Sequence, residues 1–453
     1  MTGERSPEAM ALAERTLALV GRSAATAEAE VNVTLGTSAL TRFANSRIHQ
    51  NMDGETAEIG VRIALDGRVA SASLSGLLDD AALARLVDDA VAAARVAPVD
   101  PDWAGLTPPT RVPDLDHWDP ATAEAAPADR AARVAAFVAA AEGLEAAGYC
   151  ETSALTTAFA NSAGHAVVGR TTSAVMDGIA RTGTSDGAGR GASVRLADLD
   201  GGAIGARAAS KARAAADPTD LEPGRYEVLL EPQPVADLVS FLGIYGFNGR
   251  AVEQGTSFVR VGEAQLDPAI TLRDDPADPG QVALGFDVEG TPRYGVDLVR
   301  AGVSTSLLHS RRTARRAGGG AVSTGNAYPG AWVPGAIPSA TVLAAGDRDD
   351  DALLAGVGRG LLVTDVFYTR VLDPRTLVVT GLTRNGVWLV EDGRIVRPVK
   401  NLRFTQSYVE ALAPGNVRAV GAQQHLVTNG FDVLALVPSL HLGSWHFSGG
   451  ARG

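Results

Sequence analysis

The sequence has little of what would place a protein outside the cell or within a membrane. Cys150 is the only cysteine among the 453 residues, so no disulfide can form within the chain. No apolar run approaches the roughly 18 residues of a membrane-spanning helix. Residues 1–7 include Glu4 and Arg5 and contain no apolar segment typical of a signal peptide. We therefore expect a cytoplasmic protein.

Histidines are few, and their spacing does not suit a local metal site. No two of the seven are three or four residues apart, the spacing that places two imidazoles on one helix face. His441 and His446 are five apart, which places them on opposite faces of a strand. The other five are His49, His117, His165, His309 and His425. A metal site assembled from distant residues stays open, beside surface and packing roles.

The composition is that of a globular protein with an acidic balance. Hydrophobic residues make up 45% and charged residues 20% of the chain. The 40 basic and 52 acidic residues give a formal net charge of -12. This balance argues against nucleic acid or an anionic membrane as the main partner. The length predicts two or three domains.

The order of predicted elements recurs in the first half of the chain. The patterns predict helices over 7–22 and 79–96, with strands over 28–35, 56–65 and 68–75. After a connector with seven prolines, they predict helices over 129–147 and 200–216, a strand over 149–160 and a strand pair over 165–182. Asp66-Gly67 is a strong hairpin turn.

The recurrence extends to the residues themselves. Residues 37–46 (TSALTRFANS) resemble residues 152–162 (TSALTTAFANS), with one insertion. We interpret this as an internal duplication, and chance similarity in an Ala- and Ser-rich chain is the alternative. The predicted boundaries are a first α/β half over 1–96, a proline-rich connector over 97–127, a second α/β half over 128–220 and a C-terminal domain over 221–453.

The C-terminal domain is predicted to be rich in strands. Turn-forming residues fill 217–224, and beyond them a strand over 226–230 and a helix over 235–247 are expected. Short strands follow over 361–368, 377–380, 386–390 and 394–398, with a turn at Asp392-Gly393. The predicted fold class is α+β, with a duplicated α/β N-terminal region followed by a β-rich, barrel- or sandwich-like domain.

Three glycine-rich segments match catalytic or nucleotide-binding patterns only loosely. Residues 183–187 fit G-x-S-x-G, 187–192 fit a dinucleotide pattern, and 356–360 are also rich in glycine. None has the required strand before it and helix after it, so we expect turns or strands. Four arginines form a separate basic run, which is either a solvated helix face or a contact for an acidic peptide or a partner subunit. They are Arg311, Arg312, Arg315 and Arg316.

Several motifs in one order resemble the TldD/PmbA family. Residues 286–292 read F-D-V-E-G-T-P, and residues 323–327 read S-T-G-N-A. Between them lies Leu308-His309-Ser310, and residues 42–50 resemble the opening motif of the same family. The resemblance extends from about residue 30 to about residue 450.

The resemblance also indicates what this chain has lost. TldD-type members carry H-E-x-x-x-H on the first helix of the C-terminal domain, where two histidines bind zinc and the glutamate acts as base. Alignment on residues 255–257 places these positions at Ser240, Phe241 and Tyr245, which cannot replace them. The family's further cysteine ligand lies near the C-terminus, whereas Cys150 lies in the other domain. The resemblance is therefore to the PmbA (TldE) side, with no catalytic residue and no metal ligand in this chain.

Such chains pair with a TldD-type partner that bears H-E-x-x-x-H. The resemblance thus implies a heterodimer with zinc in the partner, enclosing a chamber that admits unfolded or leader peptides. The residues expected near the chamber, whose alternative role is turn formation, come from two segments. They are Asn248, Gly249, Arg250, Gly255, Thr256, Ser257, Ser323, Thr324, Gly325 and Asn326.

Two other functions remain open. One is a self-sufficient or pathway-specific hydrolase of an amide or other C–N bond with zinc-independent chemistry, in which Ser240 and Tyr245 would take part. The other is a homo-oligomeric shell that binds peptides without cleaving them. In every case residues 235–247 should form a helix with Phe241 and Tyr245 packed on one face.

Overall fold

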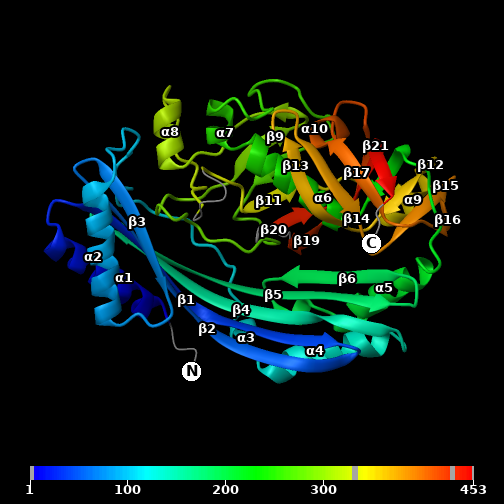
Figure 1. The fold of residues 1–453 in the computed structure, drawn as a ribbon, viewed down its shortest axis with the longest axis horizontal. Coiled ribbons are helices and arrows are strands. Elements are labelled where there is room, and N and C mark those ends of the chain that lie inside the picture. The colour runs from blue at the N-terminus through cyan, green and yellow to red at the C-terminus, as the bar shows by residue number, and fades with distance from the viewer. Residues whose placement is uncertain (1–4, 329–334, 429–433, 451–453) are drawn as a thin grey trace.

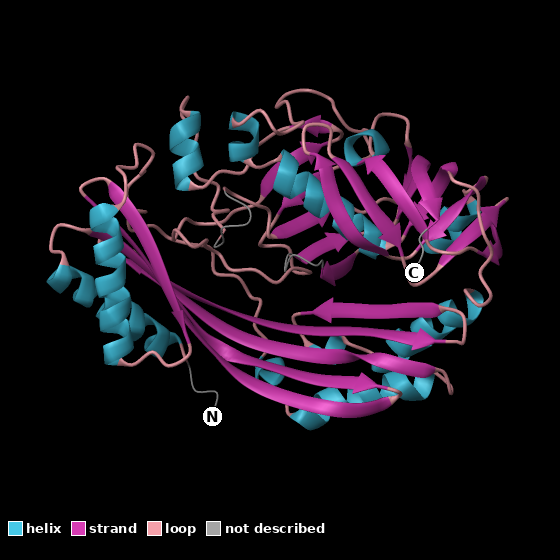
Figure 2. Cartoon of the chain, viewed as in Figure 1, coloured by secondary structure: helices cyan, strands magenta, loops and turns pink. Residues whose placement is uncertain are grey.

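A computed structural model describes residues 5–328, 335–428 and 434–450, and these residues form three β-sheets. A long, curved N-terminal sheet lies along one side of the molecule, with its concave face toward the C-terminal domain (Figure 1). Most of the C-terminal domain is sheet, with a few short helices (Figure 2). Within the described residues, no helix is both long and apolar enough to cross a membrane.

The N-terminal sheet is antiparallel throughout and has the order β3-β2-β1-β4-β5-β6. Its strands are β1 (Glu28–Ala44), β2 (Arg47–Leu65), β3 (Arg68–Ser75), β4 (Glu145–Asn161), β5 (Ala166–Arg181) and β6 (Asp186–Ser193). The predicted turn at Asp66-Gly67 is confirmed, and both residues have the positive φ (51° and 73°) that this hairpin turn requires. The strand pair expected over 165–182 is instead one long strand, β5.

The two repeats meet at the centre of this sheet. Strand β1 pairs with β4, and Ser38 lies opposite Ser153, its own equivalent in the repeat. Nearby, Thr34 Oγ1 and Thr157 Oγ1 lie 3.2 Å apart in a hydrogen bond. The duplicated region therefore builds one continuous sheet, to which each repeat contributes three strands and the pair of helices that flanks them.

Helices cover the outer face of the N-terminal sheet in two pairs, each with its own apolar core. One pair is α1 (Ser6–Ser23) and α2 (Asp80–Val96); the other is α4 (Pro127–Ala140) and α5 (Gly201–Ala214). Helix α4 is shorter than the 129–147 expected, because Glu142 and Gly143 take positive φ and end it before β4. The short helices α3 (Pro120–Ala123) and η1 (Leu196–Asp198) complete this region.

The C-terminal domain consists of two open mixed sheets, which confirms the α+β class and the sandwich-like form rather than a closed barrel. The larger sheet contains β7 (Gly224–Leu230), β12 (Arg359–Val363), β13 (Val366–Asp373), β14 (Val378–Thr383), β15 (Val387–Glu391), β16 (Arg394–Pro398), β17 (Leu402–Ser407), β18 (Val417–Val420) and β21 (Leu440–Gly450). The smaller contains β8 (Leu272–Asp274), β9 (Val296–Arg300), β10 (Val303–Ser304), β11 (Ala340–Leu343), β19 (His425–Thr428) and β20 (Leu434–Val437).

One helix of this domain lies between the two sheets. Helix α6 (Pro232–Phe241), continued by the π-helical turn η2 (Leu242–Gly246), contacts β11, β19 and β20 of the smaller sheet and β7 and β13 of the larger. The remaining helices are α7 (Gly249–Glu253), α8 (Arg311–Ala317), α9 (Asp350–Ala355) and α10 (Tyr408–Ala411). The strand expected over 361–368 is divided at Thr364 and Asp365, which bond to Asn385 instead of continuing the ladder.

Candidate functional site

Helix α6 carries two of the positions that the family resemblance aligns with the zinc motif of TldD-type members, and η2 carries the third. Prolines at its start suit a first turn, whose amides need no partner within the helix. Apolar residues on both faces, among them Val235, Ala236, Leu238 and Val239, are almost fully buried. A helix with apolar residues on most of its surface belongs inside a core, and this one lies in the main core of the C-terminal domain.

Of the three positions that the resemblance aligns with the zinc motif, two are buried and the third, Tyr245, is half-buried. Ser240 and Phe241 are 0% and 1% exposed. The Phe241 ring stacks on Tyr245 with centroids 5.7 Å apart and planes 13° apart, and it meets Tyr408 edge-on at 5.9 Å. The prediction of a helix with Phe241 and Tyr245 on one face is confirmed, except that its last turn is π-helical rather than α-helical.

Close packing explains the small residues of that π turn. A Cβ on Gly243 would lie 2.2 Å from the Pro338 ring, and one on Gly246 would lie 2.4 Å from the Phe258 ring. Neither position has room for a larger side chain. The turn is therefore fixed from two sides by segments 335–339 and 257–259.

An aspartate on the same helix was missed by the sequence reasoning. Asp237 accepts hydrogen bonds from Tyr408 Oη at 2.7 Å and Thr369 Oγ1 at 2.8 Å. Burial raises the pKa of Asp237 to about 6, against the lowering effect of these two bonds. The two carboxylate oxygens thus accept from a hydroxyl group on β13 of the larger sheet and from one on α10, which anchors α6 to both elements.

The side chains present do not fit a zinc ion. A hydroxyl, a phenyl and a phenol at 240, 241 and 245 offer no imidazole, carboxylate or thiolate, the groups that bind zinc in proteins. In the parts of the chain that the structure describes, no three His, Cys, Asp or Glu side chains are grouped closely enough to hold a metal. Cys150 lies in the N-terminal sheet, where burial raises its pKa to about 11 and keeps the thiol protonated.

The first predicted chamber segment is a capped turn beside the π turn. Asn248 caps α7 by accepting the Arg250 N–H at 3.1 Å, and the Gly249 N–H donates to the Leu308 carbonyl at 2.9 Å. A Cβ on Gly249 would lie 2.3 Å from the His309 ring, so glycine is required there. Gly255 has a φ of 65° that favours glycine.

The two residues that follow secure this segment to the helix. The Thr256 N–H donates to the Ala251 carbonyl at 2.9 Å. Ser257 Oγ donates to the Gly246 carbonyl at 2.7 Å, which joins the segment to the end of η2. These contacts are within the chain, and the expected contact with substrate stays a prediction.

The second predicted chamber segment meets the first through His309. Ser323 Oγ and the Thr324 N–H both donate to the His309 carbonyl, at 3.1 and 2.9 Å. Gly325 takes a φ of 75°, and Asn326 Nδ2 donates to Asp274 Oδ2 at 2.6 Å. The structure thus brings the two predicted segments together on either side of one histidine.

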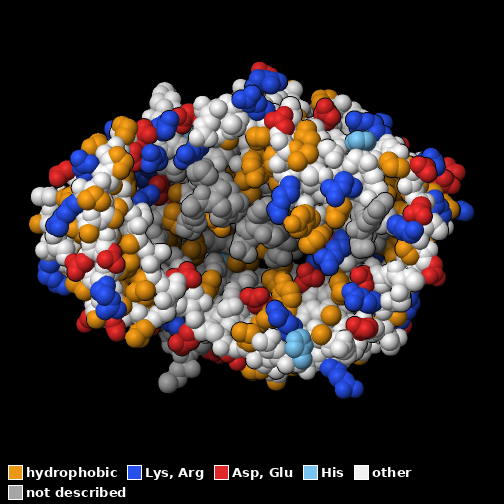
Figure 3. Space-filling model, in the orientation of Figure 1, with side chains coloured by type: hydrophobic (Ala, Val, Ile, Leu, Met, Phe, Trp, Pro, Cys, Tyr) orange, Lys and Arg blue, Asp and Glu red, His pale blue; other side chains and the backbone are white. Residues whose placement is uncertain are grey.

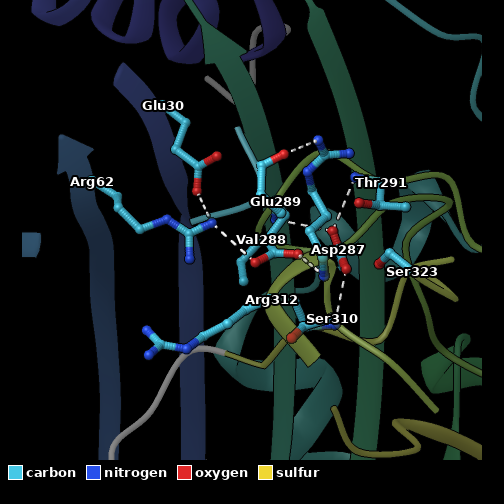
Figure 4. A network of polar contacts seen from close by, with 12 residues as sticks. Glu30, Arg62, Asp287, Val288, Glu289, Thr291, Ser310, Arg312 and Ser323 are labelled. Atoms are coloured by element: carbon cyan, nitrogen blue, oxygen red, sulfur yellow. Dashed lines mark hydrogen bonds and ion pairs between the residues drawn. The ribbon is translucent and has the colours of Figure 1, made fainter. Parts of the chain in front are cut away.

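The F-D-x-E-G-T-P block is a tight turn organised by Asp287. Its Oδ1 accepts the N–H groups of Glu289 and Thr291, both at 2.9 Å, and its Oδ2 accepts the Ala327 N–H at 2.8 Å. Burial, and secondly the charge of Glu289, raise the pKa of Asp287 to about 7. The two motifs of the family are therefore held to each other by one carboxylate (Figure 4).

Glu289, the next acidic residue of this block, joins the two domains. Glu289 accepts from Arg62 Nη2 at 3.1 Å and from the Arg311 N–H at 2.8 Å. Arg62 also forms an ion pair with Glu30, so one guanidinium of the N-terminal sheet lies between two buried carboxylates (Figure 4). Burial raises the pKa of Glu30 to about 7. We call Glu30, Arg62, Asp287 and Glu289 the junction cluster.

Backbone groups of the same block extend this contact. Asn32 Nδ2 donates to the Val288 carbonyl at 2.8 Å, and His165 Nε2 lies 2.9 Å from the Gly290 carbonyl oxygen. The only signal in the sequence for this contact between the domains was the presence of charged residues, such as Glu30 and Arg62, on strands in which apolar and polar residues alternate. A pattern of that kind does not reveal which distant residue pairs with them.

The arginine run forms helix α8, as its spacing predicts, and its side chains contact the chain's own proline-rich connector and, through Arg316, Glu253 of α7. Arg311 donates to the carbonyls of residues 104–106. Arg312 pairs with Asp100 at 2.6 Å, and Arg316 pairs with Asp102 at 3.3 Å. The sequence predicted either a solvated face or a contact for another molecule. It did not predict this contact between α8 and the connector of the same chain.

The glycine-rich segments have structural roles. Residues 182–185 form a turn, and β6 begins directly after it. A Cβ on Gly187 or Gly189 would lie 2.3 or 2.1 Å from backbone atoms of α5, so these glycines allow the helix to lie close on the strand. Arg190, which follows Gly189, pairs with Asp177 and Asp365, both at 2.9 Å.

Two cavities lie between the domains. The larger, about 550 Å³, opens between the concave face of the N-terminal sheet and the C-terminal domain, where the surface is hollowed (Figure 3). Arg190, Lys211, Glu231 and His425 are among its lining residues. The smaller, about 260 Å³, lies beside the junction cluster, and we call it the junction pocket. Ser240 and Tyr245 line neither of these cavities.

Comparison with known proteins agrees with this architecture. Residues 223–449 match the PmbA/TldA metallopeptidase C-terminal domain, and residues 29–94 match domain 1 of the same family. The fold and these domains define a metallopeptidase-related protein. The chain belongs to the PmbA/TldD family.

Solved structures with the same fold share little sequence with this chain. TldE from Thermococcus kodakarensis is 20% identical, with a TM-score of 0.85, covering 96% of this chain and 99% of that chain. A proposed modulator of DNA gyrase from Bacteroides thetaiotaomicron is 19% identical, with a TM-score of 0.84, covering 98% and 100%. These likenesses extend over both domains and establish the fold.

Curated relatives match only part of the chain. A metalloprotease of Methanothermobacter thermautotrophicus is 27% identical over 206 residues, which are 45% of this chain and 44% of that protein. A metalloprotease of Synechocystis is 27% identical over 160 residues, which are 34% and 32%. The matches thus span less than half the length of these relatives.

Proposed function

We propose that this chain is the non-catalytic, PmbA/TldE-like subunit of a heteromeric TldD-type zinc metallopeptidase. It forms part of the chamber and of the substrate channel for unfolded or leader peptides, while the partner subunit supplies zinc and activates water. The single observation that carries the proposal is the burial of Ser240 and Phe241 in the C-terminal domain, with the half-buried Tyr245 packed against the core beside them.

That packing supports the absence of a zinc site at residues 240, 241 and 245 for two reasons. The aromatic stack of Phe241, Tyr245 and Tyr408 fills the space on one side of the helix. A zinc site of the catalytic kind needs three protein ligands and an open position for water. A fully buried serine and a stacked ring provide neither, so the helix stabilises the domain instead of holding a metal.

The chamber role is supported by the shape of the molecule and by the two predicted segments. The N-terminal sheet is curved, and its concave face borders the cleft of about 550 Å³. The segments around Asn248 and Ser323 lie together next to η2. In an assembly with a related subunit, surfaces around this helix would face the substrate space of the pair.

Co-expression with a family member that bears H-E-x-x-x-H tests the proposal. We expect the two chains to purify together, and we expect zinc and cleavage of an unstructured peptide in the pair but not in this chain alone. Stoichiometric zinc in this chain alone would contradict the proposal. Peptidase activity without zinc, or a stable self-assembled oligomer that ignores the partner, would favour the hydrolase or the peptide-binding shell instead.

A further inference from the structure

Strand β13 lies at one end of the larger sheet and carries a group of exposed apolar and basic side chains (Figure 1). Phe367, Tyr368 and Leu372 are 47%, 63% and 59% exposed. Arg370 on the same strand and Arg384, directly after β14, are also exposed. Scattered apolar side chains are ordinary on a surface, whereas a contiguous group of them marks an interaction site. We call these five residues the β13 patch.

Four members of the β13 patch contact one another in a row. The Phe367 and Tyr368 rings lie with their centroids 5.7 Å apart. The Arg384 guanidinium lies over the Phe367 ring, 4.6 Å from its centroid, and the Arg370 guanidinium lies over the Tyr368 ring at 4.8 Å. These cation–π contacts hold the two long side chains in place, so binding a partner costs less side-chain entropy.

The two positive charges of the patch are not neutralised by the chain itself. Among residues 5–328, 335–428 and 434–450, no carboxylate forms an ion pair with either guanidinium. Elsewhere on the larger sheet the exposed Arg359 does form one, with Glu391 at 3.1 Å. A guanidinium presents a planar set of N–H donors that matches a carboxylate. The patch therefore suits a molecule that offers carboxylates together with apolar side chains.

The backbone of β13 disfavours the addition of another strand at this end of the sheet. The pairing of β13 with β14 is irregular between Phe367 and Arg370 and again between Val371 and Asp373. Tyr368, within the first irregularity, has a φ of 59°. Bulges of this kind interrupt the row of N–H and C=O groups with which an added strand would pair. A partner therefore contacts the side chains of the patch and does not extend the sheet.

The charge of the patch also disfavours a second copy of this chain as the partner. A closed dimer of identical chains has the same surface on both sides of its interface. Across the β13 patch, such a dimer would bring Arg370 and Arg384 against the same two arginines of the other copy. Like charges in an interface are unfavourable, so the patch fits a different chain with an acidic surface.

The patch borders the segment α6–η2. Thr369 Oγ1 of β13 donates to Asp237 of α6 at 2.8 Å. Burial raises the pKa of Tyr245, and the charge of Arg370 acts in the opposite direction, so Arg370 lies close to η2. A subunit bound to the patch would therefore lie beside the helix whose surroundings the proposed function assigns to the substrate space.

We propose that the β13 patch binds the partner subunit through an acidic and apolar surface of that subunit. Carboxylates of the partner pair with the two arginines, and apolar side chains pack on Phe367, Tyr368 and Leu372. Arginine and aromatic side chains are enriched among the residues that contribute most to binding. This inference rests on the proposed function in taking the H-E-x-x-x-H-bearing subunit as the partner, and it adds the surface by which the two chains meet.

The test is the dissociation constant of the full chain with an H-E-x-x-x-H-bearing relative, measured by calorimetry on the separately purified chains. The double variant Arg370→Glu, Arg384→Glu should weaken the complex about a hundredfold, and Phe367→Ala about tenfold. The matched control Arg85→Glu, Arg394→Glu makes the same change in net charge at two other exposed arginines and should bind as the wild type does. Added salt should weaken the wild-type complex and strengthen that of the Arg370 and Arg384 variant.

The two proposals can fail separately. A wild-type complex that neither patch variant weakens, with urea unfolding confirming that both variants are folded, overturns the patch and leaves the subunit assignment in place. Equal weakening by the control variant also overturns the patch, since the effect then follows net charge alone. A homodimer of this chain that the double patch variant disrupts would make a second copy the partner and overturn the inference. Absence of any complex with the wild type overturns the subunit assignment and the patch together.

Discussion

Two regions of the molecule, the segment α6–η2 in the C-terminal domain and the junction cluster between the domains, differ in chemistry. The α6–η2 segment is held by aromatic and aliphatic packing around Phe241. The junction cluster, by contrast, consists of carboxylates around one guanidinium. The charged F-D-x-E-G-T-P block therefore takes part in the contact between the domains, whereas α6 and η2 pack within the apolar core of the C-terminal domain. Substitutions in each region test how much each contributes to the stability of the protein.

The largest expected effect comes from the apolar region. Phe241→Ala removes a fully buried ring and its contacts with Tyr245 and Tyr408, and it should lower the free energy of unfolding by about 3–5 kcal/mol. Urea unfolding followed by tryptophan fluorescence measures the change. Phe367→Ala, at a position that is 47% exposed, is the control and should cost less than about 1 kcal/mol. Equal losses in the two variants would show that α6 is not a core element.

The next effect comes from the junction cluster. Arg62→Met leaves Glu30 and Glu289 buried without their shared cation and should lower the free energy of unfolding by about 3 kcal/mol. The triple variant Glu30→Gln, Arg62→Met, Glu289→Gln has no charge left at these positions and should recover part of that loss. If the triple variant is less stable than Arg62→Met alone, the cluster is not acting through its charges.

A smaller effect should appear as a pH dependence. Burial raises the pKa of Glu30 from 4.5 to about 7 and that of Asp287 from 3.8 to about 7. Because the folded chain binds these protons more tightly than the unfolded chain, their contribution is fully present below about pH 4 and is lost as the pH rises through 7. Glu30→Gln carries no such proton, so its stability relative to the wild type should increase by about 1–2 kcal/mol from pH 5.5 to pH 8. A difference that does not change with pH would contradict the assigned pKa of Glu30.

The smallest effect is expected at the exposed edge of the junction. Arg312 pairs with Asp100 of the connector, and its side chain is 49% exposed. Arg312→Ala should therefore change the free energy of unfolding by less than about 1 kcal/mol. A loss above 2 kcal/mol in urea unfolding would mean that α8 holds the connector more strongly than a surface ion pair can.

Much of the fold could be predicted where an element depends on residues that are close together in the sequence. The turns at Asp66-Gly67 and Asp392-Gly393 follow from residues that tolerate positive φ, and all four residues adopt it. The buried helix around Phe241 followed from a largely apolar segment of helical length, residues 235–247. The length of α4 could not be predicted, because the alanine-rich pattern continues beyond Ala140 while Glu142 and Gly143 end the helix.

Contacts between distant residues were the main omission. The pairing of β1 with β4 and the ion pair of Arg62 with Glu289 join residues more than one hundred positions apart, and no local pattern encodes such a pairing. The candidate residues near Asn248 and Ser323 came from the family resemblance. Their meeting around His309 became evident only from the structure.

Zinc content, measured by mass spectrometry on this chain alone and on the chain purified with an H-E-x-x-x-H-bearing relative, tests the central claim most directly. We predict less than about 0.1 zinc per molecule in this chain alone and close to one zinc per heterodimer, since only one of the two subunits would offer three protein ligands. One zinc per molecule in this chain alone would contradict the claim that its metal positions now serve only packing.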